Sequence, residues 1–362
     1  RMPKLVRVAV LTNCLEVTQY LGFNPRDVLA GVGLSKAQLQ APEHRIPIDA
    51  AVRLLEDSAA ASGCQSFGLS MAESRQLSHF GVVSLLLSHQ RTLRDALQVL
   101  VHYRHLMNDS LALFIEEAGK LVIIREEVIA DSPMSCRQAN ELAIGVMFRL
   151  CAALLGAHWQ PYSVNFTHQP PDNLQLHRRL FAWKRASGRE FNGIVCPNAS
   201  LDMTNPHADP AMARYAQSYL DSLLGHDGPS MLFEVRKAIY LLLPMGRATI
   251  EQIAQTQGMN VRTLQRRLKD DGCAFNDLIN DVRRDLVLRY LDNPNYSLGR
   301  IADMLGYSMA SSFTRWFIAQ FGMPPGEPKL MKSRRYSKPS FRVRSGVSAL
   351  PVAPLRSTPW HP

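Results

Sequence analysis

Hydrogen-bond donors gather on one face of two helix-like stretches late in the chain. In residues 261–270, Val261, Leu264 and Leu268 recur at the spacing of one helix face, which leaves the polar side chains on the other face. Arginine can bond guanine, glutamine can bond adenine, and serine or threonine can reach bases or phosphates. Contacts to nucleic acid are therefore predicted from Asn260, Arg262, Thr263, Gln265, Arg266 and Lys269 in the first stretch and from Ser308, Ser311, Ser312, Thr314 and Arg315 in the second.

Each stretch follows a copy of one short pattern, over residues 249–260 and 297–308. In both copies a Thr or Ser precedes an Ile-Ala pair, and a Gly follows near the end. The hydroxyl can cap a first helix, Ile and Ala can lie buried beside a second helix, and Gly can end the first in a left-handed conformation. Gln252 completes a capping box in the first copy, and Asn260 and Ser308 are expected to cap the following helices. The repeat predicts two helix-turn-helix units.

Between the two copies, residues 275–291 are predicted to form one linker helix. At 1.5 Å per residue this helix is roughly 26 Å long. With its flanking helices it is expected to place the two recognition helices about one turn of double-stranded DNA apart, roughly 34 Å. One chain is then expected to read two successive major grooves. Because the donors of the two copies differ, the DNA site is expected to be asymmetric.

The part of the chain before this repeat has a mixed pattern. Helical spacing dominates the first hundred residues, two β-prone runs at 111–117 and 120–128 predict a hairpin, and a long helix is expected from about 135 to 155. Two further strands (162–168 and 190–196) and a helix (173–181) complete the prediction. The fold class is therefore an α+β N-terminal domain followed by an all-α domain, mainly helical overall. The predicted divisions are 1–225 for the α+β domain, 226–230 for a linker, 231–329 for the double helix-turn-helix domain, and 330–362 for a basic, disordered tail.

The charge of the chain is concentrated at its C-terminal end. The net charge is +10, and residues 329–362 contain eight basic and no acidic residues. The folded parts are therefore almost neutral, so the prediction of DNA binding depends on the repeat. The tail is expected to add a nonspecific, salt-sensitive attraction to phosphates.

Signatures of enzymes and metal sites are absent from the sequence. It contains no G-x-G-x-x-G, no G-x-x-x-x-G-K-S/T, no H-E-x-x-H and no G-x-S-x-G. His102 and His105 are spaced for a metal, but no nearby Cys or carboxylate completes a site, and His168 is assigned to a strand end. We therefore expect no catalytic residue, cofactor or metal, and no enzymatic activity.

Cysteine usage and the apolar stretches of the sequence indicate the cellular location. Six scattered cysteines predict reduced thiols, and the longest apolar stretch, 144–159, is interrupted by Arg149 and His158. A cytoplasmic protein that does not enter a membrane is expected.

The second copy of the repeat resembles the signature of the AraC/XylS transcriptional regulators. The resemblance covers residues 231–329 and rests on Ile301-Ala302, Gly306-Tyr307-Ser308, Ser312-Phe313-Thr314-Arg315 and Gln320-Phe321-Gly322, followed by Pro325. It implies a seven-helix DNA-binding domain with two helix-turn-helix units and contacts at positions matching Arg262, Gln265, Arg266, Ser311, Ser312 and Arg315. The chain departs from the pattern at Ile318, Pro324 and Pro328.

Residues 20–210 resemble the arabinose-binding-like effector domain of some of these regulators. The matching pieces are Arg45-Ile46-Pro47, Phe67-Gly68-Leu69, the segment from Thr92 to Tyr103, and the segment from Val164 to Pro171. The resemblance implies binding of a small molecule or dimerisation, so the predicted domain 1–225 is expected to serve effector sensing or dimerisation. Together the features predict a sequence-specific transcription regulator, an activator, controlled by an unknown small-molecule effector. Its expected partners are double-stranded DNA and RNA polymerase, and it is expected to act either alone or as a homodimer. The alternatives are an enzyme or methyl-accepting repair protein with a borrowed DNA-binding module, and an architectural DNA-binding protein without an effector.

Overall fold

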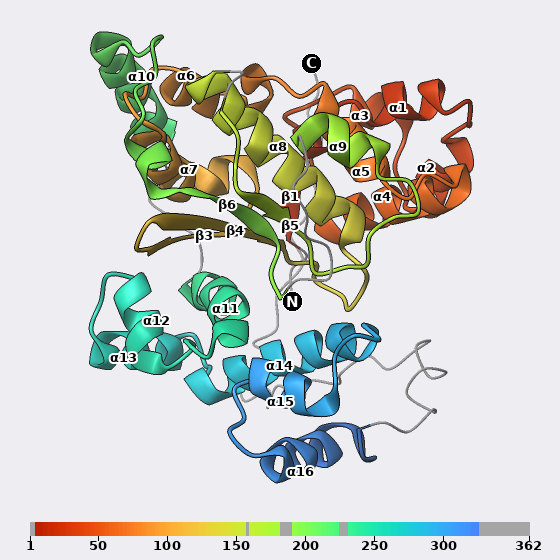
Figure 1. Cartoon of the computed structure of the whole chain (residues 1–362), viewed down its shortest axis with the longest axis vertical. Coiled ribbons are helices and arrows are strands. Elements are labelled where there is room, and N and C mark those ends of the chain that lie inside the picture. The colour runs from red at the N-terminus through yellow and green to blue at the C-terminus, as the bar shows by residue number, and fades with distance from the viewer. Residues whose placement is uncertain (1–3, 157–158, 182–189, 224–230, 326–362) are drawn as a thin grey trace, which may run out of the picture.

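The computed structural model describes residues 4–156, 159–181, 190–223 and 231–325. An α+β part lies above a group of helices, and a small antiparallel sheet separates the two (Figure 1). The predicted fold class is confirmed. The predicted linker 226–230 and tail 330–362 lie outside the described residues.

The N-terminal part contains ten α-helices and three short 3-10 helices among its described residues. The α-helices are α1 (Cys14–Tyr20), α2 (Arg26–Gly31), α3 (Lys36–Leu39), α4 (Ile48–Ser62), α5 (Phe67–Glu73), α6 (Val83–Leu87), α7 (Leu93–Met107), α8 (Arg137–Leu155), α9 (Gln175–Phe181) and α10 (Pro210–Leu223). The 3-10 helices are η1 (Val8–Leu11), η2 (Leu77–Phe80) and η3 (Asn198–Asp202).

Helix α8 lies at the centre of this part. It is the one described helix long and apolar enough to cross a membrane, and 67% of that apolar stretch lies buried inside the protein. A Cβ on Gly68 of α5 would collide with the backbone oxygen of Gln138, so the absence of a side chain allows α5 and α8 to approach closely. We therefore interpret α8 as a core helix.

Four strands form the main sheet, in the order β3-β4-β6-β5, and all neighbours are antiparallel. They are β3 (Leu111–Ala118), β4 (Leu121–Val128), β5 (Ser163–Asn165) and β6 (Gly193–Pro197), and a separate pair joins β1 (Leu5–Arg7) to β2 (Arg45–Pro47). The predicted hairpin is confirmed to within one residue at its turn. Strand β5 is shorter than predicted because, after Asn165, the backbone N–H of Thr167 bonds the side chain of Asn192.

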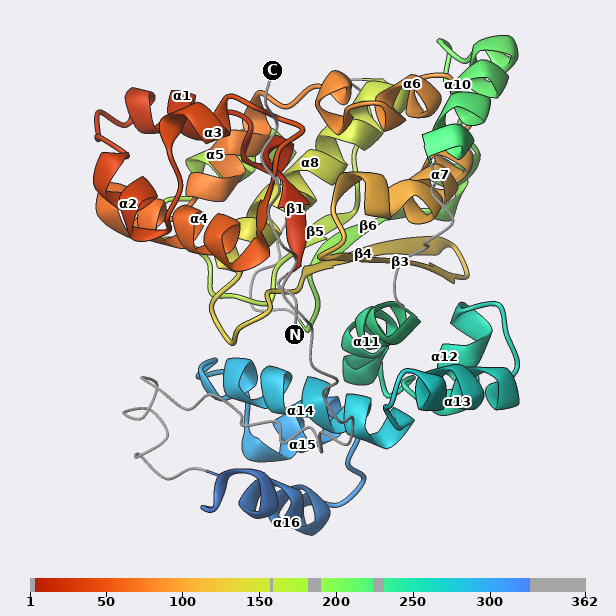
Figure 2. The same ribbon diagram turned by 180° about the vertical axis from the view of Figure 1, so that it is seen from behind.

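The two faces of the β3–β4 hairpin pack into two different hydrophobic cores, one in the N-terminal part and one in the C-terminal part. Because side chains alternate along a strand, Val122 and Ile124 face α8 and belong to the N-terminal core. Ala112 of β3 and Ile129, just after β4, belong instead to the hydrophobic cluster of the C-terminal helices. Both views of the molecule place α11 directly under this outer face of the sheet (Figure 2).

The C-terminal part is helical throughout its described residues. It comprises α11 (Met231–Leu242), the 3-10 helix η4 (Leu243–Met245), α12 (Ile250–Thr256), α13 (Val261–Asp270), α14 (Phe275–Leu291), α15 (Leu298–Met304) and α16 (Ala310–Phe321). The linker helix has the predicted bounds. Residues 231–325 thus contain six α-helices, one fewer than the resemblance implies, and the remaining residues of the expected domain, 326–329, are not described.

Candidate nucleic-acid interface

Side-chain caps fix the first helix-turn-helix unit, α12 and α13. The backbone N–H of Gln252 donates to Thr249 Oγ1 at 3.3 Å, and the N–H of Thr249 donates to Gln252 Oε1 at 3.3 Å, which is the predicted capping box. Gly258 has a φ of +65°, in the left-handed region, and ends the first helix as predicted. Asn260 then caps α13, because its Oδ1 accepts from the N–H of Thr263 at 2.8 Å.

Helix α13 separates a buried face from an exposed polar face. Leu264 and Leu268 are 0% and 1% exposed, and Val261 is partly buried. The exposed candidates on the helix are Arg262, Gln265, Arg266 and Lys269; Asn260 is also exposed, and Thr263 is half-buried.

The second unit, α15 and α16, repeats this arrangement with one difference. Ser297 caps α15 by accepting from the N–H of Arg300 at 3.1 Å, and Gly306 has a φ of +76°. The prediction that Ser308 caps the next helix is wrong. Helix α16 begins one residue later, because Met309 takes the extended cap conformation, without a side-chain bond. Ser308 lies exposed in the turn.

Helix α16 buries aromatic side chains and exposes small polar ones. Phe313 and Phe317 are buried, while Trp316 and Phe321 are half-buried. Ser311 and Arg315 are exposed, and Ser312 and Thr314 are half-buried. The Arg315 guanidinium donates to Ser312 Oγ at 3.4 Å, and Thr314 Oγ1 donates to the carbonyl of Ala310 at 3.0 Å. The two helices lie at opposite ends of the C-terminal part, with α14 between them (Figures 1 and 2).

Basic side chains elsewhere in the C-terminal part are bound to carboxylates of the N-terminal part. Arg247 pairs with Glu116 at 3.1 Å, Arg289 pairs with Glu127, and Arg300 pairs with Glu190. A hydrogen bond from Asn293 to the carbonyl of Thr167 joins the same two parts.

The cations of α13 and α16 differ from these basic residues because they form no ion pairs among the described residues. Within the residues that the structure describes, no carboxylate pairs with Arg262, Arg266, Lys269 or Arg315. These four charges therefore remain available to an external anion. Sequence reasoning did not separate the paired from the unpaired cations, because the partner carboxylates lie more than a hundred residues away in the chain.

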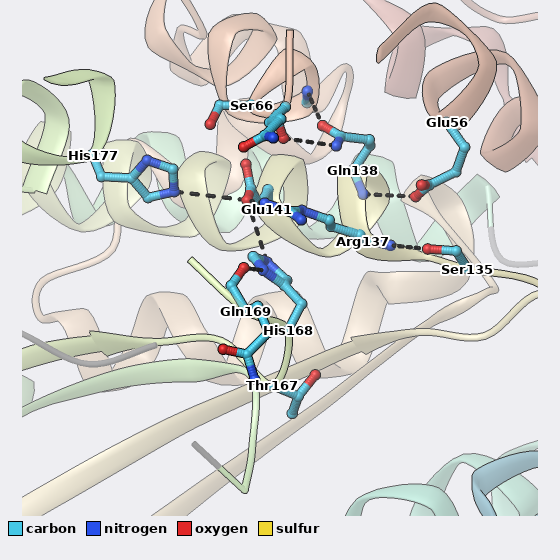
Figure 3. Close-up of polar contacts among 12 residues, drawn as sticks. Glu56, Ser66, Ser135, Arg137, Gln138, Glu141, Thr167, His168, Gln169 and His177 are labelled. Atoms are coloured by element: carbon cyan, nitrogen blue, oxygen red, sulfur yellow. Dashed lines mark hydrogen bonds and ion pairs between the residues drawn. The ribbon is translucent and has the colours of Figure 1, made fainter. Parts of the chain in front are cut away.

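A buried polar cluster around α8 is a second candidate for a functional site (Figure 3). Glu141 is fully buried, and its Oε1 lies 3.3 Å from His168 Nε2, 3.7 Å from His177 Nε2 and 3.7 Å from Arg137 Nε. Burial lowers the pKa of His168. No group of His, Cys, Asp or Glu side chains among the described residues is arranged to hold a metal ion. We interpret the cluster as a structural link between α8, α9 and the loop after β5.

Comparison with known proteins identifies the class of this chain. The model of the arabinose-binding domain of AraC transcription regulators, N-terminal, matches residues 22–205, and a helix-turn-helix domain model matches residues 253–329. The chain therefore belongs to the AraC-type transcription regulators with an arabinose-binding-type N-terminal domain. The predicted class of protein is confirmed.

Two relatives that are similar in sequence agree with this assignment. The chain is 28% identical over 323 residues to the HTH-type transcriptional regulator VirS of Mycobacterium tuberculosis, which covers 89% of this chain and 95% of the relative. It is 22% identical over 329 residues to the ornithine utilization regulator of Pseudomonas aeruginosa, covering 90% and 96%. A crystal structure of the transcriptional regulator CdpR from Pseudomonas aeruginosa is 20% identical, with a TM-score of 0.41 over 85% of this chain and 96% of that one.

Proposed function

We propose that this regulator reads a specific DNA site through α13 and α16, one in each of two successive major grooves, and that an effector bound to the N-terminal domain controls this reading. The observation that supports it is the group of unpaired cations on the two recognition helices. The proposed DNA contacts are Asn260, Arg262, Thr263, Gln265, Arg266, Lys269, Ser308, Ser311, Ser312, Thr314 and Arg315.

We propose that the protein activates transcription and does not repress it, and that RNA polymerase is a partner. Activation is supported by similarity to the urease operon transcriptional activator of Escherichia coli, 28% identical over 109 residues, although these cover only 30% of this chain and 36% of that protein. The proposed location is the cytoplasm, where a regulator meets its DNA, and the six cysteines are free thiols, as expected there.

Enzymatic activity is not part of the proposal. A methyl-accepting repair protein needs a nucleophilic thiolate, but burial raises the pKa of Cys14 to about 12, so this thiol stays protonated. Covalent modification of Cys14 or Cys64 in a mass spectrum would favour the repair protein instead. An architectural protein would bind all DNA fragments alike and respond to no small molecule.

We expect Arg266→Ala to weaken binding to the preferred DNA fragment by about 1–3 kcal/mol if Arg266 reads a base. Binding to unrelated fragments is expected to change much less. Fluorescence anisotropy on a panel of genomic fragments measures both affinities. Arg284→Ala is the matched control, because Arg284 lies in the same domain but already pairs with Asp281. An equal loss on every fragment would assign Arg266 to a phosphate, and uniform affinity of the unmodified protein would contradict sequence specificity.

A homodimer formed through α10 is also part of the proposal. Ala216 and Leu220 attach this helix to the protein, while Met212, Tyr215, Tyr219 and Leu223, which border this buried side, are 47%, 75%, 50% and 43% exposed. An exposed stripe of large apolar residues indicates an interface, and a second copy of the same stripe complements it. Helix α10 lies at the end of the molecule away from α13 and α16, so pairing leaves the recognition helices uncovered (Figure 1).

Replacing both Tyr215 and Tyr219 with glutamate is expected to convert the dimer to a monomer, because the interface would then bury four like charges. Sedimentation velocity measures the mass in solution. Ser218→Glu adds a charge at an exposed position beside the stripe and is expected to leave the dimer intact. A monomeric unmodified protein, or a dimer that survives the double substitution, would contradict this interface.

A further inference from the structure

A large cavity lies between the N-terminal and the DNA-binding parts. Its volume is about 1110 Å³, slightly above the usual range for small-molecule sites. Helix α7 and strand β3 line it on one side, and α11 and the end of α12 line it on the other. His102 and His105 are part of this lining. Their spacing in the sequence suits a metal pair, but no nearby Cys or carboxylate completes a metal site.

One region of the cavity wall is charged. Glu234 accepts a hydrogen bond from Arg104 through Oε2, and its Oε1 lies 2.6 Å from Lys237 Nζ. The side chain of Lys237 is 4% exposed, and its ammonium makes no well-formed hydrogen bond. Two cations therefore share one buried carboxylate.

The charges nearby do not restore neutrality. Asp109 is the other acid in this region of the lining, and Arg45 lies 3.7 Å from its carboxylate. Counting Arg45, Arg104 and protonated Lys237 against Asp109 and Glu234 leaves one positive charge in excess, because the other charged pair of the lining, Arg94 and Glu117, cancels. A ligand with a single negative charge would balance this excess.

Other parts of the wall are apolar. Leu97 and Val101 of α7 and Leu241 of α11 line the same cavity. We propose that this cavity is the effector site and that it binds a small organic carboxylate, with the carboxylate group at Lys237 and Arg104. The apolar body of the ligand lies against the leucine and valine side chains. This inference rests on the proposed effector control and adds the position and the chemical class of the ligand.

The cavity also touches the first helix-turn-helix unit. Thr256 and Gln257 at the end of α12 line it, directly before the Gly258 turn and the Asn260 cap of α13. A ligand in the cavity thus contacts the sensing domain and a DNA-reading unit at once. Because it would bind only the arrangement in which both walls are present, it would stabilise that arrangement.

Proton uptake is expected to accompany binding. Burial, and then the charge of Arg104, lower the pKa of Lys237 to about 7, against the attraction of Asp109. The groups that face Lys237 are Arg104 and His105 of α7, Asp109, and Glu234 on its own helix; burial lowers the pKa of His105. A carboxylate favours the charged lysine, so binding is expected to tighten as pH falls through about 7.

The test is calorimetric titration of the full chain with phenylbutanoate and cyclohexanecarboxylate, each paired with its neutral amide. We expect the carboxylates to bind and the amides not to bind. Lys237→Met is expected to weaken carboxylate binding by about tenfold or more, since it removes a charged partner. Lys120→Met, which removes an exposed lysine at the β3–β4 turn, is the matched control and should leave affinity unchanged. Circular dichroism checks that each variant is folded.

Several results would overturn the inference: no binding of either carboxylate, equal binding of acid and amide, or full affinity in folded Lys237→Met. If Lys237→Met does not fold, Val101→Trp is the alternative test, because it fills the cavity without changing the charged residues. This variant is expected to abolish carboxylate binding, and retained binding would overturn the inference. Anisotropy with DNA is measured on the same samples. Specific DNA binding without carboxylate binding would refute the cavity alone, whereas carboxylate binding without specific DNA binding would refute the proposed function.

Discussion

Phe317→Ala is expected to lower the free energy of unfolding of the DNA-binding part by about 3–5 kcal/mol. Phe317 is 0% exposed, and its ring centroid lies 4.6 Å from that of Phe321 and 5.8 Å from that of Phe313. Truncation removes the contacts of this aromatic cluster and leaves a cavity beneath α16. Because domains are typically stable by only about 5–15 kcal/mol, the variant should lose most of its folded population under mild denaturant. Urea unfolding followed by tryptophan fluorescence measures the loss.

The neighbouring substitution Ile318→Ala is the control. Ile318 is 43% exposed on the same helix, so its truncation is expected to change stability by less than about 0.5 kcal/mol. Equal effects of the two substitutions would contradict the burial pattern of α16. Such a result would also weaken the assignment of Ser311 and Arg315 to the exposed face of α16.

Glu141→Ala is expected to destabilise the N-terminal part by about 3–5 kcal/mol. The substitution removes the buried carboxylate that faces Arg137, His168 and His177 and leaves the Arg137 charge without its partner (Figure 3). Urea unfolding of the full chain, followed by circular dichroism, measures the change. Glu141→Gln, which keeps the shape but not the charge, should separate the electrostatic loss from the packing loss. A stable, fully folded Glu141→Ala protein would contradict this account.

The same cluster gives stability a dependence on pH. Because burial lowers the pKa of His168 below its ordinary value of 6.5, the unfolded chain binds a proton there that the folded chain does not. This contribution therefore makes stability fall as pH drops below about 6.5. Glu141 partly opposes the lowering, so Glu141→Ala should make the protein still more sensitive to acid.

Local patterns predicted the candidate site well where the relevant contacts are local. The capping box at Thr249, the turn at Gly258 and the full extent of α14 each depend on neighbours within a few residues, and all three are confirmed. The prediction that Ser308 is a cap is wrong because the two copies share a sequence pattern but not a turn length: the turn before α16 is one residue longer than the turn before α13.

Long-range contacts could not be predicted in this way. The sequence does not distinguish an arginine that faces DNA from one that pairs with a distant carboxylate. Arg289, for example, pairs with Glu127, and only the folded structure brings these two residues together. The same holds for the cavity, whose charged wall joins Arg104 to Glu234. The sequence places His168 at a strand end, but β5 ends at Asn165. The imidazole ring of His168 instead lies 3.3 Å from Glu141 Oε1.

The two-sided hairpin β3–β4 limits how this regulator can be recombined with its relatives. Ala112 and Ile129 complete the hydrophobic cluster of the C-terminal helices, although they lie in the N-terminal half of the sequence. A chimera cut at the linker would therefore join a foreign DNA-binding domain to a sheet surface that was matched to α11. In an engineered chimera, the outward-facing side chains of the hairpin should therefore be taken from the same protein as the DNA-binding domain. These side chains pack in the hydrophobic core of that domain and not in the core of the sensor domain.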